Sequence, residues 1–306
     1  MGTPFITLLQ PQDVLHRYEK TNPHTQQASI IPKTFLDAMS VREAVYVKEQ
    51  NIPLENEFDS DDPRSFHWVI YASVNKTDTP AVISPESGTI LRPRRSTHIS
   101  LPIGTIRLVP FPHPAHPQNG GVYIDGQLTT TAVTTPTLER NLETPSSEKL
   151  PSPTSPLSLG FEAKDRPTSF HDGQEPYVKL GRLAVLPEFR RMGIAGQLVR
   201  AATSWMQQNY VIFNPRPSEV GFDRLGMDES GSGGGVLPKW RGLICVHAQE
   251  SAVHTWAKYG FEVDEAMGTW YEEGIPHVGM WLRVQVGDGG HVEFVNSGPV
   301  VPDVMQ

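Results

Sequence analysis

The chain has 306 residues, a formal net charge of −8 at pH 7 and a hydrophobic fraction of 38%. The negative balance argues against nucleic acid as a partner, because phosphate backbones attract clustered Lys and Arg. The single cysteine excludes an intrachain disulfide, and no apolar run reaches the ~18 residues that a membrane span needs. We therefore expect a cytoplasmic protein without a membrane partner.

The first third of the chain predicts a short strand, a long amphipathic helix and two further strands. The apolar positions of the helix recur at helical spacing, Thr34 is its expected N-cap, and Pro53 ends it. An acidic loop, residues 56–64, follows the helix. The expected elements are a strand at 5–9, a helix at 34–50, and strands at 66–72 and 103–109.

Four segments are expected to lie outside the folded part, since they are rich in Pro, Ser, Thr or Gly and their apolar area cannot offset backbone ordering. They are a mobile insertion at 76–102, a disordered insertion at 111–176, a Gly-rich insertion at 213–238 and a flexible tail at 286–306. The Gly-rich insertion matches neither a P-loop nor a dinucleotide fingerprint. The rest predicts a single domain across 1–306.

The stretch from Lys179 to Arg200 organises the prediction. Residues 179–185, KLGRLAV, are interpreted as apolar and β-branched enough for a strand buried on both faces, and Pro187 prevents the strand from continuing. Small residues then open a helix in which Ile194, Leu198, Ala201 and Trp205 share a face. The first turn of a helix has free N–H groups and a positive dipole end, so this layout predicts an anion-binding site.

The last third predicts a strand at 243–247, a helix at 251–259, a turn at Gly260-Phe261 and a closing hairpin. The hairpin runs through Trp270 and Tyr271 and returns over 279–284. The single cysteine, Cys245, stands within the apolar run of the strand and is expected to be a buried, inert thiol.

Residues 190–195, RRMGIA, fit the pattern (Q/R)-x-x-G-x-(G/A), which resembles the pyrophosphate loop of the GNAT superfamily of acetyl-CoA-dependent N-acetyltransferases. The opening and closing segments look like the ElaA/YjcF branch of that superfamily. The matching residues are Val41-Arg42, Val45-Tyr46-Val47, Glu49-Gln50, Ile52-Pro53, Phe58-Asp59 and His67 in the first half, and His247-Ala248-Gln249, Gly260-Phe261, Glu273 to His277 and Met280 in the second.

This resemblance covers roughly half to two-thirds of the residues, essentially everything outside the insertions. It implies an α/β (α+β) GNAT fold: a mixed, mostly antiparallel sheet of about seven strands flanked by about four helices and splayed at its central strands. It also implies acetyl-CoA as cosubstrate and no metal. The residues expected to hold the cofactor are Leu183, Ala184 and Val185 through their backbone, then Arg190, Arg191, Met192, Gly193, Ile194, Ala195 and Gly196, and finally Trp256.

Catalysis by direct transfer requires a base for the incoming ammonium and allows an acid for the departing thiolate. Trp256 occupies the position at which many superfamily members carry a tyrosine acid, and an indole N–H is no usable acid at neutral pH. We expect Tyr259 to be a candidate for this role. The candidate bases are His277 and a water ordered by Glu57 or Asp59. Each of these residues has a plain structural alternative, such as a hairpin histidine bound to a turn or a solvated loop charge.

The resemblance thus implies an N-acetyltransferase acting on a primary amine of a small molecule, with an amino sugar among the acceptors considered. The alternatives are a non-catalytic acyl-CoA-binding or regulatory module and an acetyltransferase for protein or peptide amines. Oligomeric state carries no signal in the sequence.

Overall fold

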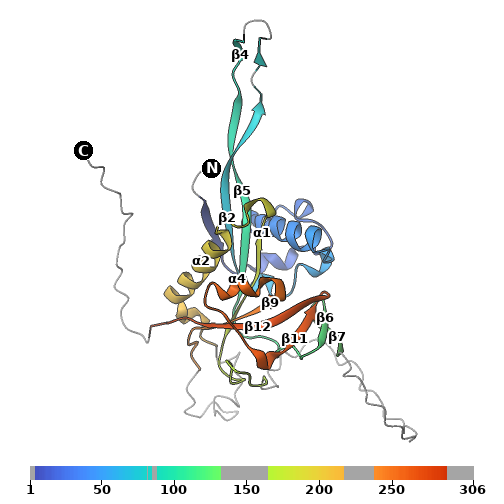
Figure 1. Ribbon diagram of the computed structural model, residues 1–306, viewed down its shortest axis with the longest axis vertical. Helices are drawn as coiled ribbons and strands as arrows, with labels where there is room; N and C mark the ends of the chain where they lie inside the picture. Colours follow the sequence, from blue (N-terminus) through green and yellow to red (C-terminus); the bar gives the residue numbers. More distant parts are fainter. Residues whose placement is uncertain (1–3, 81, 85–87, 132–164, 217–237, 288–306) are drawn as a thin grey trace, which may run out of the picture.

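The computed structural model describes residues 4–80, 82–84, 88–131, 165–216 and 238–287. These residues build a ten-stranded mixed sheet in the order β1-β2-β5-β8-β9-β12-β11-β6-β7, with β10 paired to β12 (Figure 1). Two pairs, β8 with β9 and β11 with β6, are parallel, and the other pairs of this sheet are antiparallel. The predicted mixed, mostly antiparallel α/β sheet is confirmed, with more strands than the seven expected.

The bounds of the elements follow the chain. The strands are β1 Phe5–Leu9, β2 Phe66–Thr79, β3 Val82–Ile83, β4 Ile90–Arg92, β5 Arg95–Val109, β6 Gly121–Ile124, β7 Gln127–Thr131, β8 Val178–Val185, β9 Leu243–Gln249, β10 Glu262–Val263, β11 Thr269–Glu272 and β12 Ile275–Arg283. The helices are α1 Lys33–Arg42, a π-helix Glu43–Glu49, α2 Ile194–Gln208 and α4 Val253–Ala257. None of the helices in the described ranges has the length and apolar character needed to cross a bilayer.

The predicted helix at 34–50 is present but has two parts. It begins after Pro32, whose carbonyl accepts hydrogen bonds from the amides of Phe35 and Leu36, so Thr34 is not its N-cap. From Glu43 the backbone widens into a π-helix, which ends where the amide of Gln50 bonds to the carbonyl of Val45. This wider turn carries two residues, Tyr46 and Glu49, that contact β8 and the loop after it.

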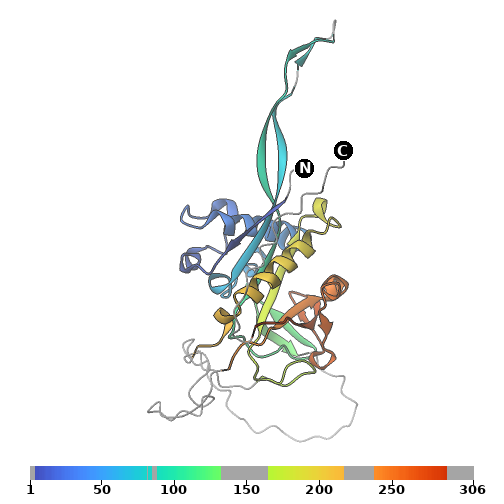
Figure 2. The same cartoon turned by 90° about the vertical axis from the view of Figure 1, so that its left-hand side faces the viewer.

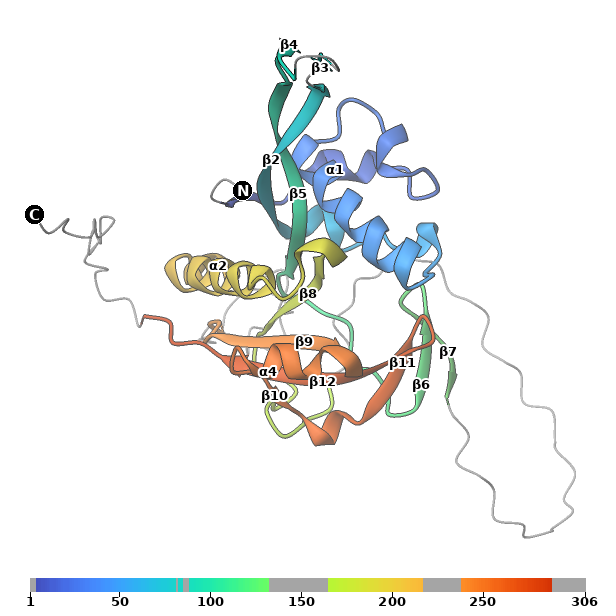
Figure 3. The ribbon, with the colours of Figure 1, turned by 45° about the horizontal axis from the view of Figure 1, so that its top comes forward.

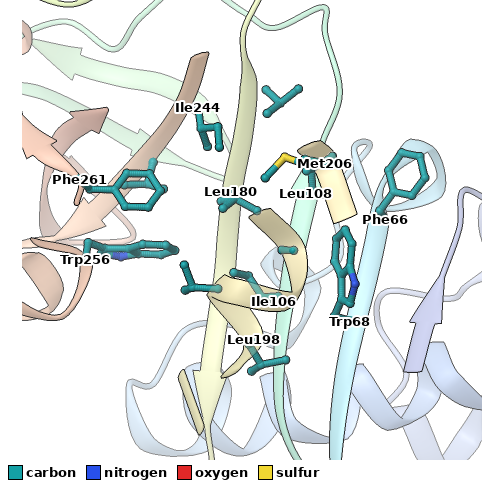
Figure 4. Packing of buried hydrophobic residues seen from close by; sticks show 14 of the residues in the cluster. Phe66, Trp68, Ile106, Leu108, Leu180, Leu198, Met206, Ile244, Trp256 and Phe261 are labelled. Carbon is teal, nitrogen blue, oxygen red and sulfur yellow. The ribbon is translucent and has the colours of Figure 1, made fainter. Parts of the chain in front are cut away.

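Helices cover both faces of the sheet (Figure 2). On one face α2 packs Ile194, Leu198, Ala202 and Met206 into the main hydrophobic core, together with Trp256 of α4 (Figure 4). On the other face α1 packs Ala38 against Val69 and Tyr71, while Val41 and Val45 contact Ala184 of β8. A separate aromatic cluster covers that second face beyond β8; it contains Tyr177, Leu243, Cys245, Met267, Trp270 and Trp281. Burial raises the pKa of the Cys245 thiol to about 12, in keeping with the inert cysteine predicted.

Residues 76–102 differ from the sequence expectation. Strands β2 and β5 pair from Phe66↔Leu108 out to Thr79↔Arg95, and β3 and β4 pair with each other at the end. Figure 1 shows this hairpin extending well away from the body of the molecule. The expectation of an insertion without structure is wrong for these described residues, because two polar strands satisfy their backbone groups by pairing with each other rather than by burying apolar area.

The second predicted insertion, 111–176, is also partly ordered. Strands β6 and β7 form a hairpin that joins the sheet through β11, and residues 165–176 lead into β8. Residues 132–164 of this insertion lie outside the described ranges, as do 217–237 of the Gly-rich insertion and 288–306 of the tail. Phe213, at the edge of the third predicted insertion, is 2% exposed in the main core.

Candidate functional site

The site lies where β8 and β9 separate. These parallel strands pair only at Val178↔Ile244, Lys179↔Cys245 and Leu180↔Val246. From Gly181 to Val185 strand β8 continues without a ladder partner on the β9 side, so a row of its backbone groups is left unpaired there. The two strands diverge beyond this point in Figure 3, and this divergence is called the gap below. An extended ligand can pair with such an edge as an additional strand would.

A bulge in β8 marks the start of this free edge. The pairing with β5 shifts between Arg107↔Gly181 and Thr105↔Ala184, and Arg182 adopts a left-handed backbone conformation with φ 49°. Side-chain contacts stabilise this conformation: the Arg182 guanidinium lies 3.1 Å from Asp59 and 3.4 Å from Glu57. The bulge therefore belongs to a fixed charged network and not to a loose strand end.

The network consists of three arginines and three carboxylates: Arg42, Arg107, Arg182, Glu57, Asp59 and Asp62. Arg42 is 1% exposed; its Nε bonds to Glu57 at 2.5 Å and its Nη1 to Asp62 at 2.7 Å. Arg107 donates two hydrogen bonds to Asp59, at 2.6 and 2.9 Å. Although burial would raise the pKa of Asp62, the charge of Arg42 holds that pKa well below its usual range. The charges of the six groups balance, so the network is a neutral support beneath the bulge.

Glu57 is part of this network and is 2% exposed. Its carboxylate is bound to Arg42 and faces Arg182, so it is engaged in ion pairs. Asp59 is likewise bound to Arg107 and Arg182. The structure thus gives both acidic residues named as water-ordering bases the alternative role of holding the sheet and its bulge. His67, also matched to the family pattern, is 1% exposed and bonds to the carbonyl of Asp62 at 2.9 Å.

The segment predicted to form an anion cradle lies at the start of α2. Gly193 precedes the helix with φ 77°, a conformation that favours glycine, and the first helical hydrogen bond runs from the Gln197 amide to the Gly193 carbonyl at 3.1 Å. The amides of Ile194, Ala195 and Gly196 therefore have no partner within the helix. Arg191 and Met192 on the preceding turn are exposed, the first with a φ of 63°. A phosphate group fits this combination of open amides, helix dipole and adjacent cations.

Arg190 is bound to groups of the protein itself. Its guanidinium forms a two-pronged ion pair with Glu49, at 2.7 and 2.5 Å, and its Nε donates to the carbonyl of Val185 at 3.0 Å. The hydroxyl of Tyr46 donates to the carbonyl of Leu183, also at 3.0 Å. Two of the carbonyls expected to face the cofactor thus already accept one hydrogen bond each. A carbonyl oxygen has two lone pairs, so each retains the capacity for another.

Tyr259 reaches the cradle from the turn that follows α4. Its hydroxyl lies so near the α2 backbone that a Cβ at Gly196 would stand 2.6 Å from it, which explains the small residue at that position. Trp256, expected to contact the cofactor, is 4% exposed and packs edge-on against Phe261 with ring centroids 5.1 Å apart. Its burial in the main core leaves little of the indole for a ligand. The tyrosine at 259 is the side chain that approaches the cradle.

Across the gap, β9, β11 and β12 bring together a group of polar side chains, of which the sequence analysis names His277 as a candidate base and His247 only as part of the family pattern. Nδ1 of His247 lies 2.9 Å from Oε1 of Glu272, which also accepts a hydrogen bond from Nε1 of Trp270 at 2.8 Å. Burial lowers the pKa of His247 to about 4, so the ring is neutral at pH 7. Although burial would raise the pKa of Glu272, the hydrogen bond from His247 holds it well below its usual range. A carboxylate can only accept, so Nδ1 carries the proton and Nε2 of His247 has a free lone pair.

His277 lies in the same group. Its Nδ1 donates to the carbonyl of Ile275 at 2.8 Å, its ring lies parallel to that of Trp270, and 7% of the residue is exposed. In its neutral form it too presents Nε2 as an acceptor. Alternation along β9 places His247 on the face opposite Val246, whose side chain packs in the core with α2. The cradle and the histidines therefore occupy opposite faces of the sheet, with the gap between β8 and β9 connecting them.

The signal for His247 and Glu272 was weak because 25 residues separate them. They meet through the antiparallel pairs Gly279↔His247 and Glu272↔Ile275, which no local pattern reveals. His247 itself stands in the family pattern, within His247-Ala248-Gln249, but the pattern alone assigns it no role.

Residues 162–218, which include β8 and α2, match the model of the acetyltransferase (GNAT) family. With the sheet order and the separation of β8 from β9, this match confirms the predicted GNAT fold. No curated protein matches the sequence.

Three solved structures are similar to this chain at low sequence identity. A candidate N-acetyltransferase from Lactobacillus plantarum is 16% identical, with 92% of this chain and 99% of that chain covered and a TM-score of 0.41. An acyl-CoA N-acyltransferase from Pseudomonas aeruginosa is 13% identical, with 91% and 99% covered and a TM-score of 0.39. Escherichia coli ElaA is 12% identical, with the same coverage and TM-score as the Pseudomonas protein.

Proposed function

We propose that the protein is an acetyl-CoA-dependent N-acetyltransferase that acetylates a primary amine of a small molecule. One observation carries this proposal: the unpaired edge of β8 leads through a short turn into the open first turn of α2. Coenzyme A has an amide-containing pantetheine arm, which needs a strand edge, and a pyrophosphate, which needs an anion cradle. The two sites occur here in that order and in contact.

In this proposal the backbone of Leu183, Ala184 and Val185 pairs with the pantetheine arm. The amides of Ile194, Ala195 and Gly196 bind the pyrophosphate, and Arg191 adds its charge. Arg190 exchanges Glu49 for phosphate when the cofactor arrives, because the Arg190–Glu49 pair is about 40% exposed on both sides and such pairs contribute little to stability.

The transfer itself begins with loss of a proton from the acceptor ammonium to a base. We assign this role to Nε2 of His247, oriented by Glu272, with His277 as the neighbouring second candidate. The amine nitrogen then forms a bond to the thioester carbon, and the carbon–sulfur bond breaks. The departing thiolate takes a proton from the Tyr259 hydroxyl or from water, and the second proton of the acylated nitrogen passes to the resulting tyrosinate or to water; a thiol pKa of about 8 to 9 makes either route feasible.

A small amine suits this arrangement best. His247 and Glu272 stand on a face that is closed at one end by a pair of hydrogen bonds between Gln50 and Gln249, at 3.2 and 2.9 Å. The carboxylate of Glu272 on this face favours a cationic substrate. A protein or peptide amine remains the alternative acceptor, and the amine panel below separates the two.

A non-catalytic acyl-CoA-binding module is the second candidate function. It is favoured by the engaged carbonyls of Leu183 and Val185 and by Trp256, which stands where a tyrosine acid is common in the superfamily. In that case the protein binds acetyl-CoA and releases no thiol with any amine.

The experiment combines calorimetric binding of acetyl-CoA with detection of free thiol during incubation with amines. The panel contains small diamines, amino sugars and Lys-containing peptides. Binding with turnover on small amines supports the proposal. Turnover confined to peptides would show that the acceptor is a protein or peptide amine. Binding without turnover on any amine would favour the second candidate function. Absence of acetyl-CoA binding overturns both functions.

A further inference from the structure

A second cluster of polar side chains lies apart from the gap between β8 and β9, next to the aromatic cluster on the same face. Nε2 of His116 is 2.9 Å from Nδ1 of His171 and 3.3 Å from Oδ2 of Asp165. These three atoms all lie within 4.8 Å of one another. His116 and His171 are 5% and 3% exposed. Two imidazoles and one carboxylate thus converge on one point inside the protein.

Each of the three side chains is oriented by a further hydrogen bond or ring contact. Nε2 of His171 lies 2.9 Å from the carbonyl of Glu175, which can only accept, so the proton is on Nε2 and Nδ1 directs its lone pair at Nε2 of His116. Without a metal these two nitrogens share one hydrogen bond, and a metal ion would replace its proton. Oδ1 of Asp165 accepts hydrogen bonds from the amides of His116 and Arg166, both at 2.9 Å, and this directs Oδ2 toward His116. Backbone groups that hold the far side of a ligand are a general feature of metal sites in proteins.

Aromatic rings fix the imidazole planes. His171 is stacked on Trp281, with ring centroids 5.4 Å apart and an interplanar angle of 24°. His116 meets the same indole edge-on at 5.5 Å. Neither imidazole can turn away from the shared point without disturbing this packing, so the donor atoms are held in place before any ligand binds.

We infer that His116, Asp165 and His171 bind a zinc ion. Zinc prefers imidazole and carboxylate donors at about 2.0–2.2 Å in a tetrahedral arrangement, which separates donor atoms by roughly 3.3–3.5 Å. Of the separations in the structure, the 3.3 Å between His116 and Asp165 matches this spacing, the 2.9 Å between the two imidazoles is somewhat shorter, and all three donor atoms lie within 4.8 Å of one another. Calcium and magnesium select oxygen donors and are disfavoured by two imidazoles. A water molecule would occupy the fourth coordination position of the ion, on the side of Asp165, whose side chain is 13% exposed.

The ion has a structural role. His116 belongs to the connection that follows β5, whereas Asp165 and His171 belong to the segment that leads into β8. Asp165 is 49 residues from His116, so the ion closes a long loop and ties the start of β8 to the rest of the sheet. This inference departs from the sequence, which predicts no metal, and it is independent of the proposed acetyl transfer.

The test uses the full chain without a histidine tag, stripped with a chelator and dialysed. Zinc is then titrated in competition with a chromophoric chelator, and the melting temperature is measured with and without zinc. We expect one zinc per chain, a rise in melting temperature on zinc addition, and visible absorption bands of tetrahedral Co²⁺ when cobalt replaces zinc. A wild-type chain that takes up no stoichiometric zinc overturns the inference.

Two variants and one control make the assignment specific. Asp165→Asn retains an oxygen for the two backbone amides, and His171→Gln retains an N–H for the Glu175 carbonyl, so both preserve the local hydrogen bonds. Each is expected to bind zinc at least about tenfold more weakly and to lose the zinc-dependent rise in melting temperature, while melting like the stripped wild type. His113→Gln is the control, because His113 stacks on Tyr177 of the aromatic cluster but is not among the three donors. Equal zinc affinity in the variants and the control contradicts the inference.

Discussion

Nδ1 of His247 lies 2.9 Å from Oε1 of Glu272, and the two residues come from strands β9 and β11, which are separated in the sheet by β12. This contact leaves Nε2 of His247 as the lone-pair donor on the face of the sheet opposite the anion cradle. In the proposed transfer, a base at this position would receive the proton of an amine that approaches from that face while the cofactor lies in the gap.

The first prediction concerns this base. His247→Gln is expected to lower kcat by about 10²- to 10⁴-fold, the usual contribution of a positioned general base, with little change in the dissociation constant for acetyl-CoA. Glu272→Gln has a smaller effect, since it removes the orienting charge but leaves the ring. The measurement is steady-state kinetics with the best amine of the panel, together with calorimetry for the cofactor. His277→Gln is made in parallel; if it reduces kcat more than His247→Gln does, the base is His277 and our assignment is wrong.

The second prediction concerns the cradle. Gly193 has a φ of 77°, and a residue with a Cβ is strained there by about 1–2 kcal/mol. In Gly193→Ala the backbone therefore leaves this left-handed conformation and the amides at the helix start shift. We expect acetyl-CoA binding to weaken by roughly tenfold, which corresponds to 1.4 kcal/mol. Calorimetry measures the change. Gly287→Ala is the matched control, because Gly287 has no atom within 4 Å of an added Cβ and no positive φ. Unchanged affinity in Gly193→Ala would mean that the helix start does not hold the cofactor.

The third prediction concerns the charged network under the β8 bulge. Arg42→Met leaves Glu57 and Asp62 buried without their main partner, so we expect a loss of about 3–5 kcal/mol in the free energy of unfolding. Urea denaturation provides the measurement. Lys33→Met, which breaks an ion pair with Asp37 whose lysine is 80% exposed, is expected to cost less than about 1 kcal/mol. Similar losses in the two variants would show that the network contributes no more than a surface pair.

The fourth prediction concerns pH. Burial lowers the pKa of His67 from 6.5 to about 4, so the folded chain binds fewer protons at this site than the unfolded chain does. Its contribution to stability is complete above pH 6.5 and is lost as the pH falls toward 4. Between pH 7 and pH 5 the loss from this residue is about 2 kcal/mol, at 1.36 kcal/mol per pKa unit.

Urea denaturation at the two pH values tests this for wild type and His67→Gln. The glutamine can still donate to the carbonyl of Asp62 but does not titrate. Its unfolding free energy is therefore expected to depend on pH less steeply than that of the wild type, where other buried histidines also contribute. If the unfolding free energies of both chains depended on pH in the same way, residues other than His67 would cause the acid sensitivity.

The sequence predicts the segment around β8 well because that segment is specified locally. The expected strand at 179–185 is observed at Val178–Val185, the start of α2 falls within the predicted cradle, and the strand at 5–9 has the expected bounds. Periodicity, a proline and a run of small residues suffice for these features. The pairing of β8 with β9 over only three residues is beyond such local signals and followed from the family resemblance alone.

The remaining differences have physical reasons. The long β2–β5 hairpin is stabilised by cross-strand pairing of polar residues, so a criterion based on buried apolar area misses it. The hydrogen bond from Tyr46 to the carbonyl of Leu183 joins residues 137 positions apart, and it depends on the π-helix after α1. The zinc ligands His116 and Asp165 are separated by 49 residues and share no spacing pattern.

The extended β2–β5 hairpin also affects how the protein behaves in solution. A strand advances about 3.3 Å per residue, so the part of the hairpin beyond the sheet adds tens of ångströms to the longest dimension of a 33.9 kDa chain while adding little mass. Such a monomer experiences more friction than a compact sphere of equal weight. In gel filtration it elutes early and resembles a larger species, so its association state has to be measured by light scattering or sedimentation equilibrium, which report mass independently of shape.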